Sequence, residues 1–182
     1  IETITSLNVR NKSISDLTGI EDFIALTNLS CGENSLIALN ISNNTALEML
    51  TANSNDITSI DLSNNLNLKE VDLGANELTA IDVSANTALT KLECPGNEIA
   101  TIDVSTNIAV ERLEVFQTDI TTIDVSTNIN LERLRVYNTN ITTINISNNT
   151  QLIELRIDNT DISSIDITNN VLLDFLKVNG SL

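Results

Sequence analysis

Residues 47–65 read LEMLTANSNDITSIDLSNN, and residues 68–86 repeat the pattern as LKEVDLGANELTAIDVSAN. The two copies are 21 residues apart, and this spacing is kept from residue 24 to residue 170. A fixed period of this length is typical of solenoids, in which each coil buries its apolar edge only against its neighbours. The period therefore predicts a stack of coils with long parallel surfaces instead of a pocket.

The order of apolar residues within one copy indicates the type of coil. The spacing LxxLxLxxNxLxxL, which runs from Leu47 to Ile60, resembles that of leucine-rich repeats. Its xLxL part alternates apolar and polar residues, as a strand does, and segment 59–63 alternates as well. The resemblance implies a mainly β, right-handed leucine-rich-repeat solenoid with parallel strands on the concave face and short second strands on the convex face. Because neither face carries bulky helices, we expect it to be gently curved.

We predict that residues 1–182 form a single leucine-rich-repeat domain with three parts. Residues 1–23 form an atypical N-terminal coil, residues 24–170 form seven 21-residue repeats, and residues 171–182 form a truncated terminal repeat. The first coil has apolar residues spaced three apart near residue 20. This spacing predicts a 3₁₀ or helical turn there.

Two asparagine columns recur once per coil and predict turns. At the first column the chain turns inward, and an amide can donate to and accept from a buried backbone group. Its members are Asn34, Asn55, Asn76 and Asn97, followed by Thr118, Thr139 and Thr160, whose hydroxyls take over this task. Asn also satisfies its own backbone in turns, so we predict a structural role for the second column, which is Asn44, Asn65, Asn86, Asn107, Asn128, Asn149 and Asn170.

Cys31 and Cys94 are the only cysteines, and they are three repeats apart in one apolar column. At about 4.8 Å per coil their separation is roughly 14 Å. A disulfide requires Cα atoms within about 7 Å. We therefore predict that both are reduced core residues.

Composition argues against several classes of function. The net charge of −16 argues against nucleic acid or an anionic membrane as the main partner. No apolar run approaches the roughly 20 residues of a membrane span. Histidine is absent, as are a glycine-rich phosphate loop, a CxxC pair and a nucleophile elbow. We therefore predict a protein that is not an enzyme, with no catalytic residues and no cofactor.

The expected convex face carries a ladder of carboxylates, which we call the acidic ladder: Asp61, Asp82, Asp103, Asp124 and Asp166, with Asn40 and Asn145 in the remaining coils. Carboxylates about 4.8 Å apart repel by roughly 1 kcal/mol in water. Calcium bound between Asp61, Asp82, Asp103 and Asp124 would relieve this repulsion. The simpler interpretation is a solvated acidic face that maintains solubility, because no DxDxDG loop is present.

The outward positions of the strands form three columns, which begin at Ser6, Asn8 and Arg10 and recur once per coil. This surface, the strand face, carries seven of the nine basic residues and three of the four aromatic residues. Arg and Tyr often anchor interfaces. We therefore predict a ligand-binding patch, the charged patch, made of Lys91, Arg112, Glu114, Phe116, Arg133, Arg135, Tyr137, Glu154, Arg156, Phe175 and Lys177. A mixed-charge ladder that only solvates the face is the alternative.

The pattern as a whole resembles the internalin-like leucine-rich repeats of bacterial surface proteins. The closing phrase IDVSxNxxL, found at residues 81–89, looks most like the 21-residue repeats of secreted Bacteroidetes proteins. The resemblance implies a non-catalytic recognition or adhesion module that binds a protein partner. It also implies a secreted or cell-surface location, with the signal peptide removed.

Two other functions remain open at this stage. The first is a carbohydrate-binding module for an acidic glycan, because Phe116 and Tyr137 could stack on sugar rings and the arginines could engage carboxylated or sulfated groups. The second is a passive spacer within a larger surface protein.

Overall fold

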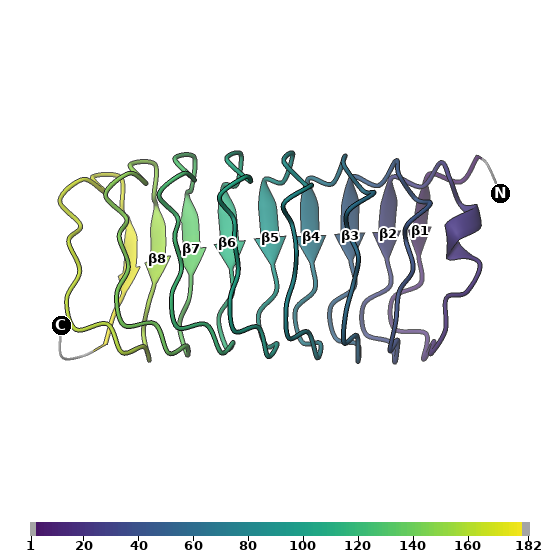
Figure 1. Ribbon diagram of the computed structural model, residues 1–182, viewed down its shortest axis with the longest axis horizontal. Coiled ribbons are helices and arrows are strands. Elements are labelled where there is room, and N and C mark those ends of the chain that lie inside the picture. The colour runs from purple at the N-terminus through teal and green to yellow at the C-terminus, as the bar shows by residue number, and fades with distance from the viewer. Residues whose placement is uncertain (1–2, 180–182) are drawn as a thin grey trace.

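The computed structural model describes residues 3–179, and within them nine parallel strands form one sheet (Figure 1). Each coil contributes one strand of three residues, and we number the coils by their strands. The order of strands in the sheet follows the chain, so each coil lies beside its neighbours in sequence. The strands are β1 (Ser6–Asn8), β2 (Asn28–Ser30), β3 (Met49–Thr51), β4 (Glu70–Asp72), β5 (Lys91–Glu93), β6 (Arg112–Glu114), β7 (Arg133–Arg135), β8 (Glu154–Arg156) and β9 (Phe175–Lys177).

Neighbouring strands keep one register along the whole sheet. Leu50 of β3 pairs with Val71 of β4, which pairs with Leu92 of β5, so partners are one 21-residue period apart. From β1 to β2 the step is 22 residues, from Leu7 to Leu29. The central residue of β3, β4 and β5 is buried and its two neighbours are half-buried. The predicted leucine-rich-repeat solenoid with parallel strands is therefore confirmed.

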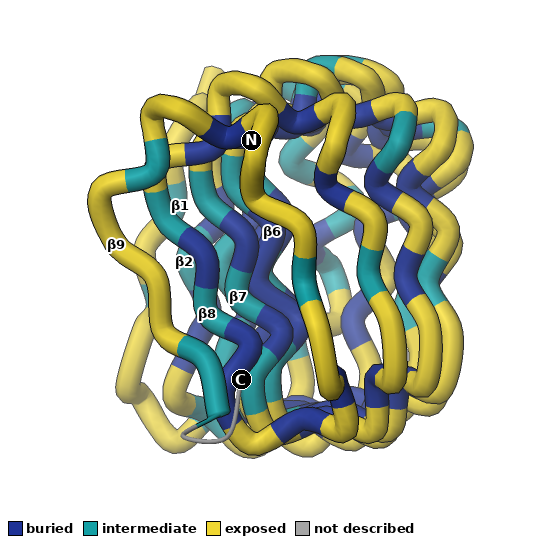
Figure 2. Tube along the Cα trace, turned by 90° about the vertical axis from the view of Figure 1, so that its left-hand side faces the viewer, coloured by how far each residue is buried: buried dark blue, intermediate teal, exposed yellow. Residues whose placement is uncertain are grey.

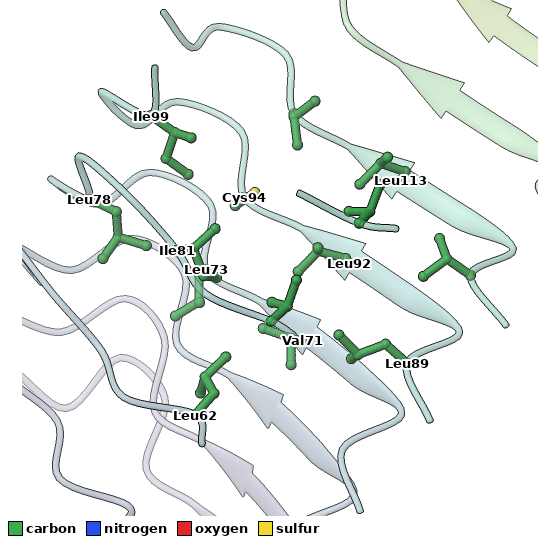
Figure 3. Packing of buried hydrophobic residues seen from close by; sticks show 14 of the residues in the cluster. Leu62, Val71, Leu73, Leu78, Ile81, Leu89, Leu92, Cys94, Ile99 and Leu113 are labelled. Atoms are coloured by element: carbon green, nitrogen blue, oxygen red, sulfur yellow. The ribbon is translucent and has the colours of Figure 1, made fainter. Parts of the chain in front are cut away.

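The interior is filled by aliphatic side chains stacked from coil to coil. Leu92 is fully buried, with Val71 and Leu113 as its register partners on the two neighbouring strands (Figure 3). Seen along the stack, buried residues follow the strands and recur at the corners of the coils (Figure 2). Because every coil is only one strand thick, its core depends on the coils on both sides.

Both cysteines belong to this core, as predicted. Cys31 and Cys94 are free and fully buried. Burial raises the pKa of the Cys94 thiol to about 12. Ala52 and Leu73 lie between them in the same column, so neither cysteine stacks on the other.

The first asparagine column connects each coil to the coil before it. The chain leaves the strand face through Ser54, whose φ of 56° is left-handed, and then reaches Asn55. The Asn55 Nδ2 donates to Ala52 O of its own coil at 3.0 Å and to Cys31 O of the preceding coil at 3.2 Å. Its Oδ1 accepts from Leu36 N at 3.0 Å. In the later coils a threonine hydroxyl replaces the asparagine amide, as predicted, but it bonds only within its own coil. Thr118 Oγ1 donates to Val115 O at 2.6 Å.

The second asparagine column is structural, but its side chains do not bond within their own turn as predicted. Asn107 is fully buried, and its Nδ2 donates to Val83 O and Asn86 O of the preceding coil, both at 2.9 Å. The turn itself is closed by backbone bonds such as Asn107 N to Val104 O. The amide is therefore free to connect coils, and the same pair of bonds recurs from Asn65 to Asn170.

The short second strands predicted on the opposite face are not formed within residues 3–179. Successive coils share isolated backbone bonds there, such as Glu77 N to Ile57 O at 3.0 Å, whereas a strand pair needs a series of such bonds. The backbone amide of Ser63, further along the segment, bonds within its own coil, because it donates to Asp61 Oδ1 at 2.9 Å. Polar turns thus take the place of the predicted second strands.

The first described coil contains the predicted 3₁₀ turn, η1 (Ile20–Asp22). Its Ile20 carbonyl accepts from Asn44 Nδ2 at 2.9 Å, so the turn supplies acceptors for the first member of the second asparagine column. In the described residues no helix is long and apolar enough to cross a membrane. Residues 180–182 of the predicted terminal repeat lie outside the described range.

Candidate functional site

The fold places all eleven residues of the charged patch on the strand face. Nine of them occupy the outward positions of β5 to β9, and Phe116 and Tyr137 follow two residues after β6 and β7. Most of these side chains are half-buried against one another. Glu114 is buried, whereas Phe175 and Lys177 are exposed. The patch is therefore a continuous surface that runs along the axis of the stack.

Ion pairs hold the arginines of the patch in defined positions. Glu154 lies between two of them: its Oε1 accepts a hydrogen bond from Arg135 Nε at 2.7 Å, and its Oε2 is 2.7 Å from Arg133 Nε. The contact with Arg133 is a charge contact, because the N–H does not point at the oxygen. Glu114 is paired more loosely, at 3.4 Å from Arg135 and 3.9 Å from Arg133. Further pairs join Lys91 and Arg112 to Glu93, and Arg156 and Lys177 to Asp158.

These pairs determine the protonation of the patch carboxylates. Burial raises the pKa of Glu154, but the hydrogen bond and charge of Arg135, together with Arg133, outweigh it, so the pKa is lowered. At Glu114 burial has a larger effect than the charge of Arg135, so the pKa of Glu114 is raised. Glu154 is thus the firmly ionised centre of the network.

The aromatic residues of the patch form a stack with one arginine. The rings of Phe116 and Tyr137 are 4.3 Å apart and within 11° of parallel. From the next coil, Arg156 places its guanidinium carbon 3.8 Å from the centroid of the Tyr137 ring. Because Phe116 and Arg156 come from the coils on either side, both faces of Tyr137 are covered. In this arrangement neither face of Tyr137 is open for stacking on a sugar ring, and binding of a glycan stays a prediction.

A groove of about 500 Å³ runs beside the first column of the strand face. Its walls include residues that sequence reasoning did not select, because each stands one position before a strand, outside the alternating pattern: Thr90, Glu111, Glu132, Ile153 and Asp174. Lys91, Arg112 and Arg133 line the same groove. A second hollow of about 320 Å³ lies between Gly74, Pro95 and Phe116. The groove adds acidic side chains to a row of basic ones.

Charge is distributed unevenly between the strand face and the rest of the protein. The three outward columns hold seven basic residues and six acidic ones, which leaves the face with a net charge of about +1. The remaining surface has only Lys12 and Lys69 against nineteen acidic residues, or about −17. The strand face is thus nearly neutral within a strongly acidic protein.

Asp72, at the end of β4, is a carboxylate whose charge opposes folding. Burial raises its pKa, and the hydrogen bond from Gly74 N at 3.1 Å offsets only part of this effect. A carboxylate with a raised folded-state pKa destabilises the fold above that pKa, and the penalty vanishes when pH falls below about 4.

We expect Asp72→Asn to melt at the same temperature as wild type or a few degrees higher at neutral pH, because the amide keeps the bond from Gly74 without the charge. The difference should disappear in melts recorded at acid pH. Asp82→Asn is the matched control and should change the melting temperature in the opposite direction. The hydroxyl and amide of Ser84 lower the pKa of Asp82, so the charge of this carboxylate favours folding. If Asp72→Asn melts well below wild type at neutral pH, the buried charge of Asp72 does not destabilise the fold.

The acidic ladder lies on the face opposite the strands, where each carboxylate closes a turn. Asp103 Oδ1 accepts from Ser105 N at 2.9 Å, and the hydroxyl and amide of Ser105 lower the pKa of Asp103. The same bond is made by Asp61, Asp82, Asp124 and Asp166. Within residues 3–179 no three His, Cys, Asp or Glu side chains gather closely enough to hold a metal ion.

Comparisons with known proteins give relatives in sequence and in fold. The sequence matches no protein-family profile. Internalin J of Listeria monocytogenes serotype 4b (strain F2365) is 47% identical over 45 residues, which are 25% of this chain and 5% of internalin J. The functional domain of InlJ from Listeria monocytogenes, described as including a cysteine ladder, superposes with a TM-score of 0.95 at 37% identity, covering 97% of this chain and 40% of that one.

Internalin C2 from Listeria monocytogenes shares the fold, with a TM-score of 0.92 at 19% identity over 96% of this chain and 80% of its own. A leucine-rich-repeat protein of Leptospira interrogans has a TM-score of 0.84 at 22% identity, over 91% of this chain and 46% of its own. The chain spans 40% of the InlJ domain and a smaller part of full-length internalin J. Internalin-like leucine-rich-repeat proteins are thus its sequence and structural neighbours.

Proposed function

We propose that this leucine-rich-repeat solenoid, whose sequence and structural neighbours are the internalins of Listeria, is a non-enzymatic recognition module that binds a protein partner through the charged patch. The internalin-like fold is consistent with a protein-interaction module. By analogy with surface proteins of this kind, we place the chain outside the bacterial cell, secreted or attached to the surface.

The distribution of charge carries this proposal. A binding surface on a protein of net charge −16 must avoid repelling most partners, which are themselves often acidic. The strand face meets this condition, and it also holds the Arg and aromatic side chains that dominate binding energy at interfaces. Ion pairs such as Arg135 with Glu154 already order these side chains, so little conformational entropy is lost on binding.

The same geometry favours a protein over a glycan. Recognition of a sugar ring requires an open aromatic face, and Phe116 and Arg156 cover both faces of Tyr137. An extended surface of mixed charge instead suits a partner with its own pattern of charged side chains. A passive spacer would have no need of an ordered patch.

The test begins with a screen of the intact chain against a protein array and a glycan array. For a protein that binds, we expect Arg112→Ala and Phe175→Ala each to weaken affinity by about 2 kcal/mol, as truncation of an interface anchor does. Both side chains are partly or well exposed, so the melting temperature should change little. Arg133 and Tyr137 are less suitable, because their removal would disturb contacts inside the fold.

Ser30→Ala and Thr51→Ala are the matched controls, because they lie on the same face in coils two and three. They should bind with wild-type affinity. Equal losses at both ends of the face, or no loss at either, would contradict a binding site in the charged patch. Hits confined to glycans would replace the protein partner with the carbohydrate alternative.

A further inference from the structure

The second column of the strand face separates its charges by sign. From β4 to β9 it reads three carboxylates followed by three cations: Asp72, Glu93, Glu114, Arg135, Arg156 and Lys177. The change of sign falls between β6 and β7. The part of the column from β4 to β9 is therefore antisymmetric about its midpoint, between β6 and β7.

This arrangement is unfavourable within a single chain. Register places Glu93 beside Glu114, and Arg135 beside Arg156, and like charges on adjacent strands repel. Only the pair Glu114 and Arg135 joins opposite signs along the column. Within residues 3–179, ion pairs with residues of the flanking columns reach five of the six charges, all except Asp72, and offset part of the repulsion. Alternating signs would avoid these repulsive contacts, and the segregated order instead matches a partner that presents the same charges in reverse order.

We propose that the charged patch binds a second copy of this chain, face to face, with the order of the coils reversed. A two-fold axis parallel to the strands and midway between β6 and β7 places β4 opposite β9, β5 opposite β8 and β6 opposite β7. Asp72 then faces Lys177, Glu93 faces Arg156, and Glu114 faces Arg135. Two-fold symmetry forms each of these pairs twice, and all are of opposite sign.

The flanking columns support the same arrangement. In the third column, Phe116 of one copy lies opposite Tyr137 of the other, so the aromatic stacks meet near the axis. In the first column, Lys91 lies opposite Glu154. The only like-charged pairing is Arg112 with Arg133, and these residues share a groove with Glu111 and Glu132. Facing sheets pack about 10 Å apart, a gap that long charged side chains from both copies can fill.

The nearly neutral strand face makes this contact possible between two copies that each carry a charge of −16. The remaining surface, with nineteen acidic residues against two lysines, would repel a second copy more strongly. The inference rests on the proposed function, since it uses the same patch and specifies its partner. A module of this kind would make homophilic contacts between molecules or between cells.

The experiment measures the mass of the 182-residue chain by sedimentation over micromolar to millimolar concentrations at moderate salt. We expect a concentration-dependent dimer in the wild type. Glu93→Lys and Arg156→Glu should each weaken self-association at least about tenfold, because each replaces two attractive cross-chain pairs with repulsive ones. A mixture of the two variants should restore a mixed dimer, because the new charges are complementary to each other.

Variants away from the strand face serve as controls for net charge. Asp103→Lys changes the total charge by the same amount as Glu93→Lys. Lys12→Glu changes it by the same amount as Arg156→Glu. Neither control should weaken the dimer. Melting curves verify that each variant is folded, and Glu93→Gln and Arg156→Gln replace any that is not. Partial loss of the dimer is expected for these neutral forms.

A wild type that stays monomeric throughout overturns the inference, as does a dimer that survives both charge reversals or is not restored by mixing. These outcomes leave the proposed function intact if the arrays still yield a protein whose binding depends on Arg112. Conversely, a dimer with the expected charge dependence and no other binder makes the second copy the partner.

Discussion

We expect Leu92→Asp to abolish the cooperative melt of the folded chain. Leu92 is fully buried at the centre of β5, and four strands lie on either side of it in the sheet. The substitution removes a core side chain and buries an unpaired carboxylate, which together cost several kcal/mol, against a total stability of about 5–15 kcal/mol. In a stack of coils the damage also separates the two halves, because each coil is stabilised by its neighbours.

Circular dichroism during heating checks this expectation. Leu92→Met is the control that preserves volume, and it should cost less than about 1.5 kcal/mol. Lys91→Asp introduces the same carboxylate one position earlier, where the side chain points outward, and the chain should still fold. A Leu92→Asp protein that melts like the wild type would show that this residue does not face the core.

Asn107→Ala should lower the free energy of unfolding by about 1–3 kcal/mol, the second-largest loss that we expect. The amide of Asn107 donates to Val83 O and Asn86 O of the preceding coil, and alanine leaves both carbonyls buried without this donor. It also leaves a cavity where the amide was.

Chemical denaturation ranks this variant against Asp103→Ala in the same coil. Asp103 is exposed and closes a local turn through Ser105 N, so its removal should have a far smaller effect. If Asp103→Ala proves to be the more damaging change, the connection between coils depends on the acidic ladder and not on the second asparagine column.

Much of this fold can be predicted from the sequence, because a strict period repeats the same pattern of buried and exposed residues from coil to coil. The alternation around Leu50 identifies which face of a strand is buried, and the 21-residue period then stacks Leu50 under Val71 and Leu92. The prediction of second strands was wrong because alternation reports burial and not hydrogen bonding. Segment 59–63 alternates, but its Ser63 amide bonds to Asp61 of the same coil and not to the next coil.

The candidate site was only partly predictable for a related reason. A column in the sequence says which residues stack, so the strand-face position of Arg135 and Tyr137 follows from the period alone. It does not say which way a long side chain turns. Arg135 reaches diagonally to Glu154 of the next coil, and Arg156 folds over Tyr137, so contacts that cross columns decide which surfaces remain open.

The second asparagine column gives the solenoid a direction. Every amide in it donates toward the N-terminus, from Asn170 to Ile146 O down to Asn44, which ends on the carbonyls of Ile20 and Phe23. Within this column, the N–H groups of each asparagine depend on the preceding coil, whereas the carbonyls that they reach also accept backbone donors, as Ile146 O does from Asn149 N. Buried orphan donors are rarer in proteins than under-used carbonyls. The column therefore needs buried acceptors at its N-terminal end, and the carbonyls of Ile20 and Phe23 make the first coil the cap that supplies them.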